Sequence, residues 1–172
     1  MTTFLEPVVV ADVAGLCGYV LDKVNVALED CGRPVTTRFV AAGLVAWDDC
    51  CGMLVVAPER VYRTARFPVE GPDENNCFDG LVAVTLVVLI MRCVPVLDDR
   101  GQPPSSEAMG AAYGDLLHDA AVVWNELGDK MWPDGWESTG QNQVFVGAEG
   151  GCIGAETRVT LGLDQEAFCP TC

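Results

Sequence analysis

The chain has 172 residues, half of them hydrophobic, and 25 acidic against 10 basic side chains give it a formal net charge of -15. The hydrophobic fraction excludes intrinsic disorder, which needs low hydropathy together with high charge. The length is typical of one domain that buries its core without disulfide or metal support. The acidic balance excludes a sequence-independent grip on nucleic-acid phosphates, because that binding needs Lys and Arg to displace counterions.

The hydropathy pattern predicts neither a signal peptide nor a membrane span. Residues 1–6 contain no basic region of the kind that opens a signal peptide. The longest apolar run, residues 81–91, is too short to cross a bilayer as a helix, for which about 20 residues are needed. We therefore expect a soluble protein.

Residues 7–30 predict an amphipathic helix. Apolar side chains recur there every three or four residues, which places them on one stripe. Pro7 suits the first turn, where its missing N–H costs nothing, and Gly32 suits the C-terminal stop. The stripe consists of Val9, Val13, Leu16, Val20, Val24 and Leu28.

The next segment is rich in β-branched and aromatic residues and predicts strands. We expect strands over 39–47 and 53–57, joined by a turn at 48–52. The second strand continues over 59–65, and Pro58 between its halves requires a bulge or an edge position. Residues 66–80 then form a long polar loop, and loops of this length are usually functional or mobile.

Residues 81–96 are almost continuously apolar, which predicts a central strand buried on both faces. After a break at 98–101, a second helix begins at an N-cap supplied by Ser105 or Ser106 and ends at Gly128. Its apolar stripe consists of Met109, Ala112, Tyr113, Leu116, Ala120, Val123, Trp124 and Leu127.

The C-terminal part predicts a hairpin. Residues 129–142 are expected to be an irregular connection, followed by two short strands over 143–146 and 156–163. The glycine-rich residues 147–155 between them predict a wide hairpin tip, and residues 164–172 predict an irregular tail.

The order helix, strands, helix, hairpin favours an α+β fold. We expect a single, mainly antiparallel β-sheet with two amphipathic helices packed on one face. No linker or repeat divides the chain, so residues 1–172 are expected to form one domain.

Nine cysteines are the most unusual feature of the composition. Zinc can take four thiolates, and Cys169-x-x-Cys172 with the adjacent Cys50-Cys51 pair invites that interpretation, but no second Cys-x-x-Cys exists. Disulfides are the alternative in a particle that leaves the cell, with at least one thiol left over. We expect most of the nine to be free thiols acting as small hydrophobes, Cys17 and Cys93 above all. The remaining positions are Cys31, Cys77 and Cys152.

No residue pattern assembles an active site. A Cys–His hydrolase would need an imidazole beside a thiolate, yet His118 falls on the polar side of the second helix and is expected to be solvated. The pairs Asp48-Asp49 and Asp98-Asp99 lack the alternating oxygens of an EF-hand and are expected to be solvated turn residues.

Two further features can be explained by a structural role, without a binding site. Residues 147–154 are glycine-rich but match no phosphate-binding loop. The tryptophans Trp124, Trp132 and Trp136 suit an interface or ordinary packing equally well. We therefore expect no catalytic, cofactor-binding or metal-binding residues, and a protein that is not an enzyme.

Five stretches of the sequence resemble neck proteins of long-tailed phages that infect actinobacteria. They are Val45-Ala46-Trp47-Asp48-Asp49-Cys50-Cys51-Gly52, Glu59-Arg60-Val61-Tyr62-Arg63, Phe67-Pro68, Met91-Arg92-Cys93-Val94-Pro95-Val96 and Asp98-Asp99-Arg100-Gly101. The expected order of elements is also similar to the tail terminator family of siphovirus-type phages. Those proteins have a helix, a β-meander, a second helix and a closing strand or hairpin.

That resemblance implies a structural virion protein assembled in the host cytoplasm. It implies a homo-oligomeric ring, a hexamer, that caps the tail tube protein, stops its polymerisation and meets a head-side connector or stopper protein. Double-stranded DNA would pass through without specific binding, and an acidic lumen would repel it. The segments 66–80 and 129–142 are candidates to reach neighbouring subunits.

The resemblance transfers no catalytic residue, because the family has none. The nine cysteines are not part of the general terminator pattern, which leaves open another head–tail connector component such as a stopper or adaptor. From a different class, a small cysteine-dependent hydrolase is the remaining alternative. None of these interpretations involves a membrane.

Overall fold

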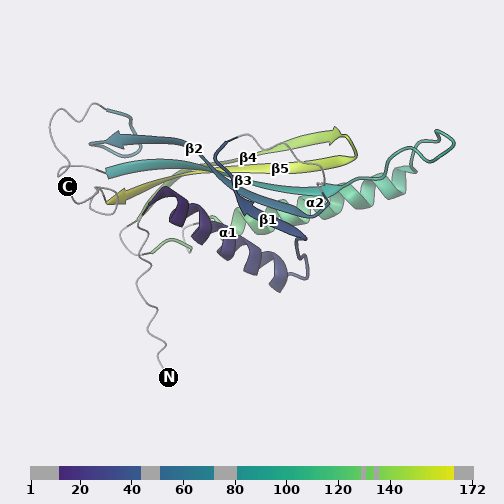
Figure 1. The fold of residues 1–172 in the computed structure, drawn as a ribbon, viewed down its shortest axis with the longest axis horizontal. Helices are drawn as coiled ribbons and strands as arrows, with labels where there is room; N and C mark the ends of the chain where they lie inside the picture. The colour runs from purple at the N-terminus through teal and green to yellow at the C-terminus, as the bar shows by residue number, and fades with distance from the viewer. Residues whose placement is uncertain (1–11, 44–50, 72–80, 129–130, 134–135, 165–172) are drawn as a thin grey trace, which may run out of the picture.

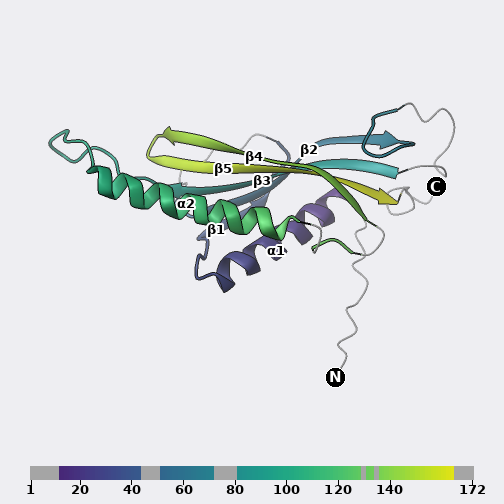
Figure 2. The ribbon, with the colours of Figure 1, turned by 180° about the vertical axis from the view of Figure 1, so that it is seen from behind.

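The computed structural model describes residues 12–43, 51–71, 81–128, 131–133 and 136–164 (Figure 1). They form one five-stranded sheet in the order β1-β2-β3-β5-β4, with both helices on one face, as the view from behind also shows (Figure 2). The predicted α+β fold is therefore confirmed. In chain order the elements are α1 (Val13–Asp30), β1 (Thr37–Val40), β2 (Met53–Thr64), β3 (Leu81–Cys93), α2 (Ser106–Glu126), β4 (Glu137–Glu149) and β5 (Cys152–Asp164).

Helix α1 begins later than predicted. Asp12 is the N-cap, with an extended backbone, and its Oδ1 accepts a 2.7 Å hydrogen bond from the N–H of Gly15. An aspartate in this position satisfies one of the free N–H groups of the first turn, which is why the helix starts at Val13. Pro7 and Val9, on which the earlier start depended, lie outside the described residues.

The predicted stop of α1 is confirmed. Gly32 has a φ of 70°, a conformation that glycine adopts without strain, and the N–H of Arg33 donates to the carbonyl of Leu28 at 2.7 Å. The described part of the predicted stripe faces the sheet. Leu16, Val20, Val24 and Leu28 are fully buried, and Val13 is half-buried.

The predicted hairpin between the first two strands is wrong. β1 pairs with β2 in parallel, from Thr37 opposite Met53 to Val40 opposite Val56. Strand composition indicates extended backbone but not strand direction, and parallel neighbours cannot be joined by a tight turn. β1 also starts at Thr37 rather than residue 39, and residues 44–50 of the predicted strand and turn lie outside the described residues.

The long β2–β3 pair supports the middle of the sheet. The ladder shifts register between Pro58 and Arg60, so of the bulge and the edge position that the proline predicted, the structure has the bulge. β3 lies between β2 and β5, and its side chains reach both faces, which confirms a central strand. β3 ends at Cys93, before the predicted residue 96.

The core has two unequal parts. The main core lies between the sheet and the two helices, and a smaller apolar cluster lies on the helix-free face. Within the described residues, no helix combines the length and apolarity needed to cross a bilayer. The smaller cluster consists of Met53, Val55, Leu89, Met91 and Cys152, with Phe39 and Ala41 packed against it.

The segment after β2 folds back over the helix-free face. Tyr62 donates through Oη to the carbonyl of Pro68 at 2.8 Å, and Thr64 donates through Oγ1 to the carbonyl of Val69 at 2.6 Å. The ring of Phe67 lies so close to Gly162 of β5 that a Cβ there would be 2.8 Å from it. Residues 66–71 therefore pack against their own sheet, and residues 72–80 lie outside the described residues.

Helix α2 begins where the sequence predicts. Ser105 is the N-cap, and its Oγ accepts from the N–H of Ala108 at 3.1 Å. The helix ends at Glu126, with Leu127 as its C-cap, two residues before the predicted stop at Gly128. Tyr113 and Trp124 of the predicted stripe are exposed. The stripe members buried against the sheet are Leu116, Ala120, Val123 and Leu127.

The closing hairpin differs from its prediction. β4 and β5 are 13 residues each, and a tight turn at Gly150 and Gly151 joins them, with φ values of 59° and 83°. Two consecutive residues with positive φ are typical of a type I′ hairpin turn. The strand β4 begins at Glu137, inside the segment 129–142 predicted to be irregular. After Glu137, the first half of β4 consists of Ser, Thr, Gly, Gln and Asn residues, so it has no alternation of apolar and polar side chains. For this reason the sequence did not predict a strand there.

Candidate functional site

Among the described residues, Asp119 of α2 is the charged side chain that is completely buried. Its Oδ1 accepts from Nε of Arg33, and its Oδ2 accepts from Nε of Arg92, both at 2.6 Å. Asp115, one turn earlier and exposed, binds Nη1 of Arg33 at 2.8 Å. A buried carboxylate keeps its charge only with such partners, so the cluster ties the segment after α1 to β3 and α2.

Arg92 also holds the connection between α1 and β1. Its Nη1 donates to the carbonyl of Pro34 and its Nη2 to the carbonyl of Arg33, both at 2.9 Å. The hydrogen bond to Asp119 raises the pKa of Arg33 above its usual value, against the opposing effect of burial, so Arg33 is always a cation. The two guanidinium groups are balanced by two carboxylates. The cluster therefore offers little charge to a ligand and acts as a structural clamp.

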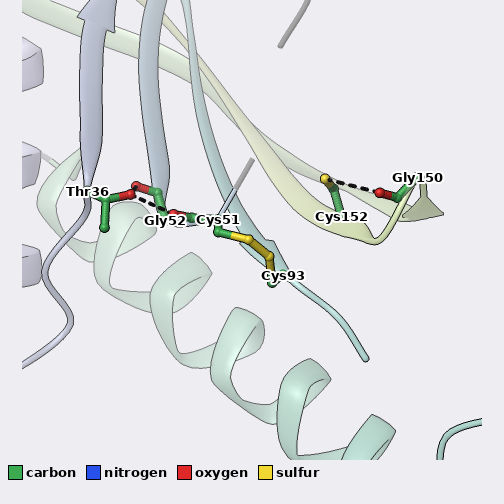
Figure 3. Close-up of a disulfide and its surroundings, with 6 residues drawn as sticks. All are labelled: Thr36, Cys51, Gly52, Cys93, Gly150 and Cys152. Carbon is green, nitrogen blue, oxygen red and sulfur yellow. Dashed lines mark hydrogen bonds between the residues drawn. A yellow bond between two sulfur atoms is a disulfide. The ribbon is translucent and has the colours of Figure 1, made fainter. Parts of the chain in front are cut away.

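A pocket of about 680 Å³ opens beside this clamp. Its wall includes both arginines and the backbone after α1. A disulfide between Cys51 and Cys93 also lines it, and Figure 3 shows this bond. The bond joins the residue before Gly52 to the last residue of β3, and the two Cα atoms are 4.7 Å apart. Thr36 donates through Oγ1 to the carbonyl of Cys51 at 2.6 Å, which connects the start of β1 to the same point.

The disulfide corrects the prediction that Cys93 is a free, buried thiol. Met53 pairs with Met91 in the β2–β3 ladder, so continuing the register by two residues places Cys51 opposite Cys93. The two cysteines are 42 residues apart in the sequence, so no local pattern predicts their pairing. Cys152, the partner of Cys93 in the β3–β5 ladder, is disulfide-bonded as well.

The two thiols that are free among the described residues have opposite environments. Cys17 is fully buried in α1, as predicted, and burial, together with the nearby charge of Asp12, raises its pKa to about 11. A thiol in that state is a poor nucleophile, because the thiolate is the reactive form. Cys31 is exposed at the C-cap of α1. Cysteines 50, 77, 169 and 172 lie outside the described residues.

The other candidate residues remain apart. His118 is exposed on α2, as predicted. Asp98 is an exposed turn residue, as predicted, and its Oδ1 accepts from the N–H groups of Arg100 and Gln102 at 2.9 and 2.8 Å. The pair Asp48-Asp49 lies outside the described residues. In the part of the chain that the structure describes, no group of three or more His, Cys, Asp or Glu side chains could hold a metal ion.

Of Trp124, Trp132 and Trp136, two pack against other aromatic rings. Trp132 and Trp136 stack with ring centroids 6.2 Å apart, and Tyr19 of α1 meets Trp136 edge-on at 6.4 Å. Tyr19 also donates through Oη to the carbonyl of Met131 at 2.9 Å. These contacts anchor the segment after α2 against α1, whereas Trp124 is exposed.

A second pocket, of about 410 Å³, lies on the helix-free face of the sheet. Apolar side chains of β2 and β3, including Val55, Val87 and Leu89, line it. On its rim Arg158 pairs with Glu59 at 3.1 Å and with Glu156 at 3.0 Å, and the hydrogen bond to Glu59 raises the pKa of Arg158. The rim thus holds one guanidinium between two carboxylates, with a net negative charge above an apolar floor.

The clamp around Asp119 is the feature that sequence reasoning missed. Asp119 lies three residues after Leu116 and four before Val123, so it occupies the edge of the apolar stripe of α2. An acidic residue in that position is a signal for a buried partner, since unpaired buried charge is strongly unfavourable. The sequence offers no signal for which arginines would supply it.

In comparisons with known proteins, no family model and no curated protein matches this chain.

Proposed function

We propose that this protein is a structural component of a phage neck, a tail terminator that forms a ring on the end of the tail tube. The order of elements carries the proposal: helix α1, the antiparallel β2–β3 pair, helix α2 and the closing β4–β5 hairpin. This order is similar to that of the tail terminator family. The parallel β1 is a departure from a simple meander.

The distribution of chemical groups supports a structural role over a hydrolase. The two free thiols of the described residues are the buried Cys17 and the exposed Cys31, and His118 lies exposed on a different helix. The charged residues of the clamp bind one another. A nucleophile needs a nearby base and an accessible thiolate, and the described residues do not combine them.

The net negative charge of the chain supports a protein that surrounds DNA without binding it. A net charge of -15 repels phosphates, so double-stranded DNA would pass through an acidic ring without specific binding. In this proposal the ring is a hexamer at the top of the tail, assembled in the host cytoplasm. The partners are the tail tube protein on one side and a head-side connector or stopper on the other.

Native mass spectrometry of the purified chain tests the proposal, with negative-stain electron microscopy to see the shape of any assembly. Six copies in a closed ring are expected, alone or on addition of the tail tube protein encoded by the same phage. A chain that stays monomeric under both conditions would contradict the proposal. Twelve copies would favour an adaptor-type connector instead.

A further inference from the structure

The disulfide between Cys51 and Cys93 is open to solvent. Both residues are exposed, and the bond lines the wall of the pocket of about 680 Å³ beside the clamp. A disulfide breaks when a thiolate reaches one of its sulfur atoms, so exposed disulfides are the labile ones. A dissolved thiol can therefore reach this bond while the protein stays folded.

Cys51 and its neighbour Gly52 hold the entry to β1. Thr36 donates through Oγ1 to the carbonyl of Cys51 at 2.6 Å (Figure 3). The carbonyl of Gly52 accepts from the N–H of Thr36 at 2.7 Å and from the N–H of Thr37, the first residue of β1, at 3.2 Å. Gly52 has a φ of 80°, and a Cβ there would lie 3.2 Å from Oγ1 of Thr36, so the two segments approach closely. These contacts fix the point at which β1 starts.

Cys93 is joined to a second anchor of the same segment. It follows Arg92, whose guanidinium donates to the carbonyls of Arg33 and Pro34, just before Thr36. The disulfide thus connects the two groups of contacts that position the chain between α1 and β1. Breaking the bond removes this covalent tie between the two anchors.

β1 is the element that such a change affects first. It is four residues long, lies at the edge of the sheet and has three exposed residues. Segments with few buried contacts open locally at a low cost in free energy. The long β2–β3 ladder and the main core, by contrast, are held by many buried apolar side chains. Loss of the disulfide should therefore loosen β1 and leave the rest of the fold in place.

We propose that the Cys51–Cys93 disulfide is a redox switch, which fixes β1 on the sheet when oxidised and allows β1 to open locally when reduced. A dithiol supplies the reduction. One of its thiolates attacks a protein sulfur to form a mixed disulfide, and its second thiolate then attacks that bond and releases the protein. Two electrons and two protons pass to the protein, which gains the thiols of Cys51 and Cys93, while the dithiol becomes a disulfide. The inference needs only one copy of the chain, so it goes beyond the proposed function and does not depend on it.

Hydrogen exchange followed by mass spectrometry tests the switch, with the full chain compared before and after addition of dithiothreitol. Iodoacetamide without denaturant should label Cys51 and Cys93 only after that addition. Peptides that cover residues 34–41 should then exchange roughly tenfold faster, because β1 opens more often. Peptides from residues 82–90 of β3 and from α2 should keep their protection, and circular dichroism checks that the fold persists.

Two variants assign the response to this bond. Cys51→Ser/Cys93→Ser should show fast exchange over residues 34–41 without dithiothreitol and no further change when it is added. This comparison separates the Cys51–Cys93 bond from the disulfide of Cys152, which dithiothreitol can also reduce. Cys31→Ser removes an exposed free thiol and should behave like the wild type in both states.

Four results would overturn the inference. The first is a Cys51–Cys93 bond that stays intact when dithiothreitol is added to the folded protein. The second is unchanged exchange over residues 34–41 after the bond is reduced. The third is a loss of protection throughout the chain, which would make the bond a general support of the fold instead of a switch for β1. The fourth is a double variant whose β1 still responds to dithiothreitol.

Discussion

Arg92, near the end of β3, donates through Nε to the fully buried carboxylate of Asp119 on α2 at a distance of 2.6 Å. The same arginine binds two backbone carbonyls in the connection that follows α1. This side chain therefore links the central strand to α2 and to the chain segment that leads into β1. The relationship explains why the helices are held at this end of the sheet.

Asp119→Asn should destabilise the fold by about 3 kcal/mol, because it leaves two partly buried guanidinium groups without their carboxylate. Urea unfolding followed by circular dichroism measures this loss. Asp115→Asn is the matched control on the same helix, and its exposed ion pair should contribute less than about 1 kcal/mol. Equal losses in the two variants would show that the Asp119 clamp adds no more than a surface pair.

The double variant Cys51→Ser/Cys93→Ser should unfold more readily than the oxidised wild type. A bond closing a loop of 42 residues restricts the unfolded chain, and the chain-entropy model gives about 4 kcal/mol for that length. Urea unfolding measures the difference, with Cys31→Ser as a control that removes an exposed thiol. If the double variant matches the wild type, the disulfide contributes nothing to the stability of the oxidised protein.

Cys17 should resist alkylation in the native protein. It is fully buried and its pKa is raised to about 11, so at pH 8 almost no thiolate is present and reagent has no access. Iodoacetamide followed by peptide mass spectrometry should modify Cys31 and spare Cys17, and urea should make both reactive. Rapid modification of Cys17 without denaturant would contradict its burial.

Alkaline pH should weaken the fold through Cys17. Its pKa rises from 9.0 as a reference thiol to about 11 in the fold, because burial disfavours the thiolate. The unfolded chain therefore loses its proton first, and the stabilising effect, complete below pH 9, declines as the pH rises toward 11. Tyr19, whose pKa is also raised by burial, acts in the same direction. Urea midpoints between pH 8 and 11 should fall less steeply for Cys17→Ala.

The sequence by itself determined the features that depend on neighbouring residues. Periodicity and capping located both helices, including an N-cap at Ser105 or Ser106 and the stop at Gly32. Continuous apolarity identified β3 as the central strand, and Pro58 predicted a bulge or an edge position in β2. Each of these signals acts within a few residues, so it can be interpreted before the chain is folded.

Only the tertiary structure decided what depends on residues far apart in the chain. The parallel direction of β1, the full length of β4 along the sheet edge and the pairing of Cys51 with Cys93 all follow from strand register. The clamp likewise depends on three segments that bring Asp119 between Arg33 and Arg92. A local pattern shows that a charged side chain lies at the edge of an apolar stripe, but only the packing of the elements determines which arginines bind it.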